Sequence, residues 1–350
     1  MTKRAEKRLK LKKRQFEKNS FDQPIQEKSN DGADSISDSS SNSLKRKYKN
    51  PFLNFYYENY KLLLILPILL LILSIIQISY QAAVNDGDFI NKDISLKGGV
   101  TITIPTEEAI DIFSFQEQLS NLGYFVNIRT LQSGGRQIAI LIESDIDISD
   151  EGSLDNLINA VSSFYPLVEG EYSVEGIGAS IGQAFFRQAI LALLVSFIIM
   201  ALIVAITFKT FVPSLAVIAS ALSDIVITVA ILNIMGFTFS TAGLAALLMI
   251  IGYSVDIDIL LSTRVLKRKE GSVFQRIGSA FKTGILMNFT TLIVLVAALI
   301  LTTSEVITQI MTVLIVGLLV DQMSTWIQNV GILRLYLDSK SKKKESSNES

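Results

Sequence analysis

The sequence contains no cysteine and no histidine among its 350 residues. The absence of cysteine excludes disulfides and metal sites built on thiolates. The absence of histidine removes the side chain that most often carries protons near neutral pH. Any proton chemistry in this chain therefore has to use Asp, Glu, Tyr or Lys. A phosphate-binding loop is also missing, which argues against ATP hydrolysis by this chain.

Apolar residues make up 49% of the chain, and they gather in blocks long enough to cross a membrane. Roughly 20 residues are needed to span the hydrocarbon core. We place the predicted spans at 61–80, 188–208, 212–235, 241–262, 280–301 and 306–328. The sequence therefore predicts a polytopic α-helical membrane protein with six transmembrane helices, in which residues 187–337 form a five-helix bundle.

The segment before the first span has a different composition. Residues 1–18 are densely basic, and residues 29–43 are rich in Ser and Asp. Segments of this kind cannot bury enough apolar surface to fold. We expect residues 1–60 to be a basic, largely disordered cytosolic tail. Its basic first residues could bind anionic lipid headgroups or ribosomal RNA. The simpler interpretation is a solvated arm that only fixes the membrane topology.

The links between the spans differ in charge. Links on one side carry Lys and Arg: Lys209, residues 264–276 and residues 340–344. Links on the other side carry neither: residues 236–240 and 302–305. Because cytoplasmic loops are enriched in Lys and Arg, we expect both termini to be cytosolic and residues 81–186 to be external. Residues 338–350 then form a second cytosolic tail.

Strand and helix signals alternate between the first two spans. Strands are predicted at 100–104, 124–131, 136–143 and 172–175, and helices after Pro105 and at 150–164. Thr106 is the candidate cap of the first helix, and Gly134-Gly135 signals a hairpin. The order β-α-β-β-α-β predicts an external α+β domain with a ferredoxin-like fold. We expect its acids to form a solvated face rather than a metal site.

Acidic side chains within the predicted spans are the unusual feature of this chain. Asp224 lies in the third span, Asp256 and Asp258 lie in the fourth, and Asp321 lies beside Gln322 in the sixth. A charge at the bilayer centre costs at least about 2.5–3.5 kcal/mol, so such residues indicate function. The alternative for Asp224 is a neutral acid that only hydrogen-bonds a neighbouring helix. Asn288 in the fifth span is expected to make only such a bond.

The two acids of the fourth span lie about 200° apart around a helix, so they cannot share a face. A stripe of small and polar residues, which would let a neighbouring backbone approach closely, contains Ala245, Gly252, Asp256 and Thr263. We therefore expect Asp256 to face the bundle and Asp258 to point elsewhere. Spacing alone does not decide the role of Arg264. It either acts together with the acids of the membrane spans or is a cation at the membrane interface.

Four short motifs occur together in this chain: Gly252-Tyr253-Ser254 followed by Ser262-Thr263-Arg264, Ala221-Leu-Ser-Asp224, Gly178-Ala-Ser-Ile-Gly182, and Leu96-Lys97-Gly98-Gly99. With these motifs, residues 175–330 resemble the SecF family, which is related to the resistance-nodulation-division transporters. The family layout of one span, an external domain and five spans matches residues 61–337. Asp256-Ile-Asp258 departs from the bacterial pattern and looks more like the archaeal branch.

The resemblance implies a function in protein export. Members of this family pair with a SecD protein beside the SecY channel, and the complex uses the proton-motive force to assist export across the cell membrane. By resemblance, Asp224 and Arg264 couple proton movement to export, with Asp256 and, more weakly, Asp258 and Asp321 beside them. The implied partners are a SecD-like protein, a SecY-type translocon, the translocating polypeptide and membrane lipids. The coupling ion is the proton, and no cofactor, metal, catalytic residue or DNA partner is expected.

Two other functions stay open. One is proton-coupled export of a lipid or small molecule by a transporter of the resistance-nodulation-division type. The other is intramembrane proteolysis by Asp224 with Asp256 or Asp258, although the Gly-x-Gly-Asp signature of such proteases is absent. Proteins that co-purify in mild detergent would separate protein export from small-molecule export.

Overall fold

The computed structural model describes residues 56, 58–85, 87–108, 110–133, 136–146, 151–167, 170–267 and 272–348. Most of the tail predicted at residues 1–60 lies outside these ranges, as do Gly134 and Gly135 of the predicted hairpin signal.

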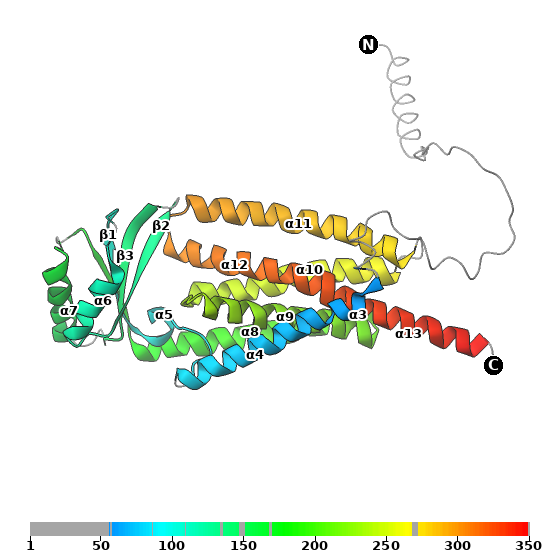
Figure 1. Ribbon diagram of the computed structural model, residues 1–350. Coiled ribbons are helices and arrows are strands. Elements are labelled where there is room, and N and C mark those ends of the chain that lie inside the picture. The colour runs from blue at the N-terminus through cyan, green and yellow to red at the C-terminus, as the bar shows by residue number, and fades with distance from the viewer. Residues whose placement is uncertain are drawn as a thin grey trace, which may run out of the picture. The chain divides into compact units, whose positions relative to one another are not determined.

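Six helices of the described chain are long and apolar enough to cross a membrane, as predicted: Tyr60–Val84, Ala179–Phe208, Phe211–Ile234, Thr241–Lys267, Val273–Leu301 and Glu305–Ser341. The first consists of α3 (Tyr60–Leu63) and α4 (Ile65–Val84), and the next four are α8 (Ala179–Phe208), α9 (Phe211–Ile234), α10 (Thr241–Lys267) and α11 (Val273–Leu301). The last consists of α12 (Glu305–Met323), a π-helix η1 (Ser324–Asn329) and α13 (Val330–Asn348). These helices make the chain a multi-pass membrane protein (Figure 1).

Several helices extend beyond the predicted spans. Helix α11 begins at Val273 rather than near residue 280, because Ser272 and Gln275 form a capping box at its start. The Ser272 hydroxyl accepts from the Gln275 backbone N–H at 3.3 Å, and Gln275 Oε1 accepts from the Ser272 backbone N–H at 2.9 Å. At the other end of the chain, α13 continues through most of the tail predicted at 338–350.

Helices α9 and α10 form the centre of the bundle. Most of their residues are buried, whereas α4, α8 and α11 leave most of their apolar side chains exposed, as lipid-facing helices do. Helix α10 packs against α8, α9, α11 and α12. Gly317 allows α12 to lie close to α10, since a Cβ atom at this position would collide with the Ile250 side chain. This packing places polar residues of α9, α10 and α12 in one interior.

The sheet domain, defined here as residues 99–177, has the predicted order β-α-β-β-α-β. Its elements are β1 (Gly99–Pro105), α6 (Ile112–Asn121), β2 (Val126–Ser133), β3 (Arg136–Ser144), α7 (Glu151–Phe164) and β4 (Ser173–Ile177). The strands lie in the order β2-β3-β1-β4, and all neighbours are antiparallel. Its core gathers alternate residues of β1 and β3 with one face of each helix: Val100, Ile102, Ile104, Ile140, Ile142, Phe115, Leu119, Leu157 and Val161.

The prediction that Thr106 caps the first helix of this domain was wrong. Pro105 still belongs to β1, and α6 begins only at Ile112. Asp111 is the cap, because its Oδ1 accepts from the backbone N–H groups of Phe113 at 3.1 Å and Ser114 at 3.3 Å. Thr106 instead closes a local turn by accepting from the Glu108 N–H at 3.2 Å.

Two of the glycine motifs meet where the sheet domain joins the bundle. The short helix α5 (Ile94–Lys97) ends at Gly98, whose φ of 87° favours glycine, and Gly99 follows with a φ of 130°. A Cβ atom at Gly98 would collide with the backbone of Ala179, and one at Gly182 would lie 2.7 Å from the Gly98 backbone nitrogen. These glycines therefore allow α5 and the start of α8 to pack backbone against backbone.

Candidate functional site

Asp224 lies in the middle of α9 with no exposed surface. The Ser254 hydroxyl of α10 donates to Asp224 Oδ2 at 2.5 Å. Ser254 is the third residue of the Gly252-Tyr253-Ser254 motif, and it is buried, whereas Gly252 and Tyr253 are exposed. The motif therefore contributes a hydroxyl to Asp224 from the inner face of α10.

Asp258 is the second acid of this interior, and it also has no exposed surface. Its Oδ1 accepts from Asn329 Nδ2 at 2.7 Å and lies 2.9 Å from the Thr325 hydroxyl. Both partners come from η1, and they are four residues apart on that helix, so they reach the same side. The π-helix thus holds Asp258 with two neutral side chains.

Asp321 of α12 is the third buried acid. Its Oδ2 accepts from Asn288 Nδ2 of α11 at 3.0 Å, which confirms the predicted interhelical bond of Asn288. Its Oδ1 lies 3.2 Å from the Thr325 hydroxyl. Asp321 and Asp258 therefore approach the same hydroxyl group from two helices.

Asp224, Asp258 and Asp321 together form what we name the acid cluster, and they lie near enough for their charges to interact. Among the described residues, no ion pair includes an acid of this cluster. The ion pairs join Lys92 to Asp88, Lys97 to Asp145, and Arg129 to both Glu143 and Glu305. Hydrogen bonds to the cluster come from neutral side chains, among them Ser254, Asn288, Thr325 and Asn329. A buried carboxylate without a cation is costly, and binding a proton removes that cost.

The prediction that Asp256 faces the bundle was wrong. Asp256 is exposed and Asp258 is buried. The inner face of α10 is formed by buried large and polar residues three or four positions apart: Leu247, Ile250, Ser254, Asp258, Leu261 and Val265. The small-residue stripe lies on the other side, and a Cβ atom at Gly252 would meet nothing within 4 Å. No backbone of the described residues therefore packs closely against the stripe at Gly252.

Arg264 bonds to α11 and not to the acid cluster. Its Nη1 donates to the Ser279 carbonyl at 2.5 Å, the Ser279 hydroxyl at 3.0 Å and the Thr283 hydroxyl at 2.9 Å. Both residues belong to α11. The structure thus brings Asp224, Asp258 and Asp321 together, but it does not bring Arg264 or Asp256 to them.

Sequence reasoning missed the polar side of η1. Besides Thr325 and Asn329, Gln328 reaches α9, where its Nε2 donates to the Ser223 hydroxyl at 3.0 Å. The available signal was the density of polar residues after Asp321: Gln322, Ser324, Thr325, Gln328 and Asn329. So many polar residues in an apolar span require partners inside the protein.

A second group of acids lies where the sheet domain meets α12. The carboxylate oxygens of Asp93, Glu143 and Glu305 lie within 4.8 Å of one another. Arg129 of β2 pairs with Glu143 of β3, and its Nη2 lies 3.3 Å from Glu305 Oε1. We name these four residues the boundary cluster. They link the sheet directly to the first turn of α12.

The expectation of a solvated acidic face was wrong for Asp93 and Glu143, which are both buried. Burial raises the pKa of Glu143 above its ordinary value, although the attraction of Arg129 opposes this shift. Because the Arg129 guanidinium already supplies a counter-charge, we interpret the boundary cluster as a structural link and not as a metal site.

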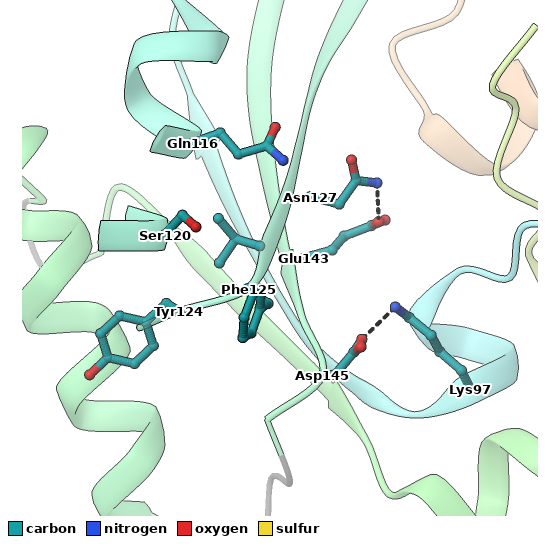
Figure 2. A pocket seen from close by; sticks show the side chains of 9 residues that line it. Lys97, Gln116, Ser120, Tyr124, Phe125, Asn127, Glu143 and Asp145 are labelled. Atoms are coloured by element: carbon teal, nitrogen blue, oxygen red, sulfur yellow. Dashed lines mark hydrogen bonds and ion pairs between the residues drawn. The ribbon is translucent and has the colours of Figure 1, made fainter. Parts of the chain in front are cut away.

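A pocket of about 220 Å³ lies beside Glu143 on the sheet domain (Figure 2). Figure 2 shows that its polar groups contact one another, since Asn127 donates to Glu143 at 3.1 Å and Lys97 pairs with Asp145. Small-molecule sites usually have volumes of about 300–1,000 Å³. The pocket is therefore a poor candidate for a ligand site.

Comparison with known proteins identifies a family. Residues 159–339 match the family described as "Protein export membrane protein SecD/SecF, C-terminal". A protein-export membrane protein SecF of Methanolacinia petrolearia is 37% identical over 79% of this chain and 94% of its own length. Those of Methanocaldococcus jannaschii (37% identical, covering 80% and 96%) and Pyrococcus furiosus (39%, covering 72% and 82%) are similarly close.

Two solved structures share the fold. The crystal structure of SecDF from Thermus thermophilus, described as a translocon-associated membrane protein, matches with a TM-score of 0.66 at 20% identity over 81% of this chain. SecDF in a super-membrane-facing form matches with a TM-score of 0.53 at 21% identity over 80% of this chain. The present chain spans only 38% and 39% of the length of these two chains.

Proposed function

Because the chain belongs to the SecF family of protein-export membrane proteins, we propose that it is an accessory subunit of the Sec pathway that uses the proton-motive force to assist protein export across the cell membrane. The observation that carries this proposal is the acid cluster, three buried carboxyls in the membrane with neutral partners. The chain itself is proposed to bind no cofactor and to hydrolyse no ATP, with protons as the coupling ion.

The energy available from protons is sufficient for such a role. One charge that crosses about 100 mV releases roughly 2.3 kcal/mol. Adding or removing a proton changes the charge between α9, α10 and α12, and this change favours a different packing of the three helices. The first turn of α12 contacts the sheet domain through Glu305 and Arg129, so a shift of α12 would move the sheet. We propose that the contact between Glu305 and Arg129 couples proton movement in the bundle to export.

Arg264 keeps its proposed part in coupling, which rests on the family resemblance. Its bonds to Ser279 and Thr283 attach it to α11 in this structure. A direct meeting of Arg264 with Asp224 therefore requires α10 to move against α11. We propose that Asp224 alternates between an ionised state beside Arg264 and a protonated state away from it.

The exposed face of α10 supports a helical partner. Asp256 lies exposed in the middle of this membrane helix, and Gly252 beside it has open space. An ionisable side chain that faces lipid is costly, so another protein is the better cover. We propose that a SecD-like protein covers this face, with a SecY-type channel, the translocating polypeptide and membrane lipids as further partners.

The orientation is also a proposal. Both termini are placed in the cytosol and the sheet domain outside, because Lys and Arg lie in the links on one side of the membrane. We further class the sheet domain as ferredoxin-like, since its element order and its antiparallel strand order β2-β3-β1-β4 fit that fold.

Asp224→Asn tests the proton coupling, because an amide of the same shape cannot exchange a proton. Export driven by the proton-motive force should fall by roughly 100-fold in membrane vesicles, while co-purification of the SecD-like partner stays unchanged. Asp256→Asn makes the same chemical change at the exposed acid of α10. Its main effect should be weaker co-purification of the SecD-like partner. Export at the wild-type rate by an assembled Asp224→Asn protein would refute the proposal.

One observation favours the alternative, export of a lipid or small molecule. An apolar groove of about 490 Å³ lies between α4, α9 and α12, lined by residues that include Leu73, Ile227, Ile231, Val316 and Leu319. Filling it with Leu73→Trp should abolish small-molecule transport but leave protein export unchanged. A lipid that co-purifies in place of translocon partners would support this second function.

A further inference from the structure

The Thr325 hydroxyl occupies an unusual position between two acids. Thr325 has no exposed surface, and its Oγ1 lies 2.9 Å from Asp258 Oδ1 and 3.2 Å from Asp321 Oδ1. The two carboxyls belong to different helices, α10 and α12, so this hydroxyl is a direct polar link between them. The family resemblance gave Thr325 no role.

Other threonines in the membrane helices use their hydroxyls differently. Thr207, Thr290, Thr308 and Thr312 each donate to the carbonyl of the residue four positions earlier, at 2.8–3.0 Å. Such bonds are ordinary for Thr in an apolar helix. Among the described residues, the hydroxyl of Thr325 has only the two carboxyl contacts. It therefore serves the acids and not the backbone.

The π-helix accounts for this difference. Thr325 lies at the second position of η1, which runs from Ser324 to Asn329 and is wound more widely than an α-helix. The Tyr56 hydroxyl donates to the Trp326 carbonyl, so a backbone group of this segment is satisfied from outside the helix. The widened turn lets Thr325 and Asn329 face Asp258 together.

The proton count of this contact is informative. A hydroxyl has one hydrogen, so Thr325 can donate to only one of the two carboxyls at a time. Both contacts are hydrogen bonds only when the other carboxyl carries a proton and donates it to Thr325 Oγ1. Amide groups fill other sites on the acids, since Asn329 donates to Asp258 Oδ1 and Asn288 donates to Asp321 Oδ2. Both contacts of the Thr325 hydroxyl are therefore hydrogen bonds when the pair shares one acidic proton.

We propose that Thr325 is a proton bridge between Asp258 and Asp321. The acidic proton passes from Asp321 Oδ1 to Thr325 Oγ1, while the hydroxyl proton passes from Thr325 Oγ1 to Asp258 Oδ1. One O–H bond breaks and one forms at the hydroxyl, so Thr325 ends neutral, Asp258 ends protonated and Asp321 ends as the anion. The reverse transfer restores the start. This bridge rests on the proposed function, because it moves charge between α10 and α12 during proton-coupled export.

Three variants of the full-length protein, in vesicles with its translocon partners, test the bridge. Thr325→Val keeps the shape but removes the hydroxyl, and it should slow proton-driven export by about 100-fold, the lower end for a positioned proton-transfer group. Thr325→Ser keeps the hydroxyl and should restore most of the rate. Thr312→Val is the matched control, since it removes a hydroxyl on α12 that donates only to the Thr308 carbonyl.

The rate in D₂O gives a second readout that a purely structural role would not change. The wild type and Thr325→Ser should slow in D₂O, and the residual export of Thr325→Val should lose this isotope effect. Wild-type export by Thr325→Val, or export by Thr325→Ser as slow as that of Thr325→Val, would overturn the bridge. If Thr325→Val does not assemble, Asp321→Asn decides, because the bridge requires an exchangeable proton there and wild-type export in this variant contradicts it.

Asp224→Asn in the same vesicles separates the bridge from the proposed function. If Asp224→Asn exports normally, proton coupling by the acid cluster is wrong, and the bridge falls with it. If Asp224→Asn is inactive and Thr325→Val is active, only the bridge is wrong. Loss in both variants, with rescue by Thr325→Ser, supports both.

Discussion

The two clusters of acids in this molecule differ in what balances their charge. The boundary cluster gathers Asp93, Glu143 and Glu305 around the guanidinium of Arg129. The acid cluster gathers three acids as well, but its partners are hydroxyls and amides: Ser254, Thr325, Asn288 and Asn329. One cluster contains its cation, whereas the partners of the other among the described residues are neutral.

This difference separates a structural role from a proton-handling role. An ion pair holds its geometry as long as both charges persist, so the boundary cluster suits a permanent link between the sheet and α12. Acids that lack a cation in a dry interior change their charge by binding or releasing protons. The acid cluster, and not the boundary cluster, is therefore the place where we expect proton exchange to change the protein.

The largest expected effect comes from the same chemical change made in each cluster. Asp258→Asn should reduce proton-driven export by roughly 100-fold and leave the folded protein intact, because an amide still accepts from Asn329. Glu143→Gln should leave export proton-dependent. Parallel export assays in vesicles check the pair, and equal losses in both variants would remove the distinction between the clusters.

The second effect concerns the cation of the boundary cluster. Arg129→Ala leaves Glu143 buried without its counter-charge, and it should lower the free energy of unfolding by about 2 kcal/mol, less than for a fully buried pair because Arg129 is partly exposed. Arg136→Ala on the neighbouring strand is the control, since Arg136 is exposed and should change stability by less than about 0.5 kcal/mol. Unfolding in detergent measures both, and similar values would contradict the structural link.

The third effect tests whether the acid cluster depends on the geometry of η1. A Cβ atom at Gly284 of α11 would lie 2.6 Å from the Trp326 ring of η1, so Gly284→Ala should cost about 1–2 kcal/mol through overpacking and should also impair export. Gly278→Ala on the same helix meets open space and should be neutral or slightly stabilising. Thermal unfolding of both variants measures this, and a neutral Gly284→Ala would show that η1 tolerates displacement.

The smallest effect is the pH dependence of the boundary cluster. Burial raises the pKa of Glu143 above its ordinary value of 4.5, so the folded state binds more protons there than the unfolded state does. The contribution of Glu143 to the free energy of unfolding should therefore be complete below pH 4.5 and should decrease as the pH rises through the raised pKa. The free energy of unfolding of the wild type, measured from below pH 4.5 to above the raised pKa, should show this decrease. The decrease should be smaller in Glu143→Gln.

The sequence was sufficient for features that depend on local pattern. Apolar length predicted the six spans, and alternating strand and helix signals predicted the order β-α-β-β-α-β. The mid-span acids Asp224 and Asp321 also stood out from their apolar neighbours. The roles proposed for these acids, and for Arg264, remain predictions until export is measured.

Features that depend on which helix lies opposite which were not predictable in the same way. Asp256 and Asp258 have the same chemistry, and only the packing of α10 against α9 and α12 shows that Asp258 is inside. The boundary cluster joins three regions that are far apart in the sequence, namely Asp93, the β2–β3 hairpin with Arg129 and Glu143, and Glu305. Thr325 looked like an ordinary polar residue, because the widened turn that directs it to two acids has no simple sequence signature.

Infrared spectroscopy of the carboxyl groups tests proton exchange in the acid cluster most directly. A protonated carboxyl absorbs at a frequency separate from that of a carboxylate, and its band shifts in D₂O. The wild type should show such a band that changes with pH, and the variant with Asp224→Asn, Asp258→Asn and Asp321→Asn together should lose it. A triple variant whose pH-dependent carboxyl absorption matches that of the wild type would contradict the account.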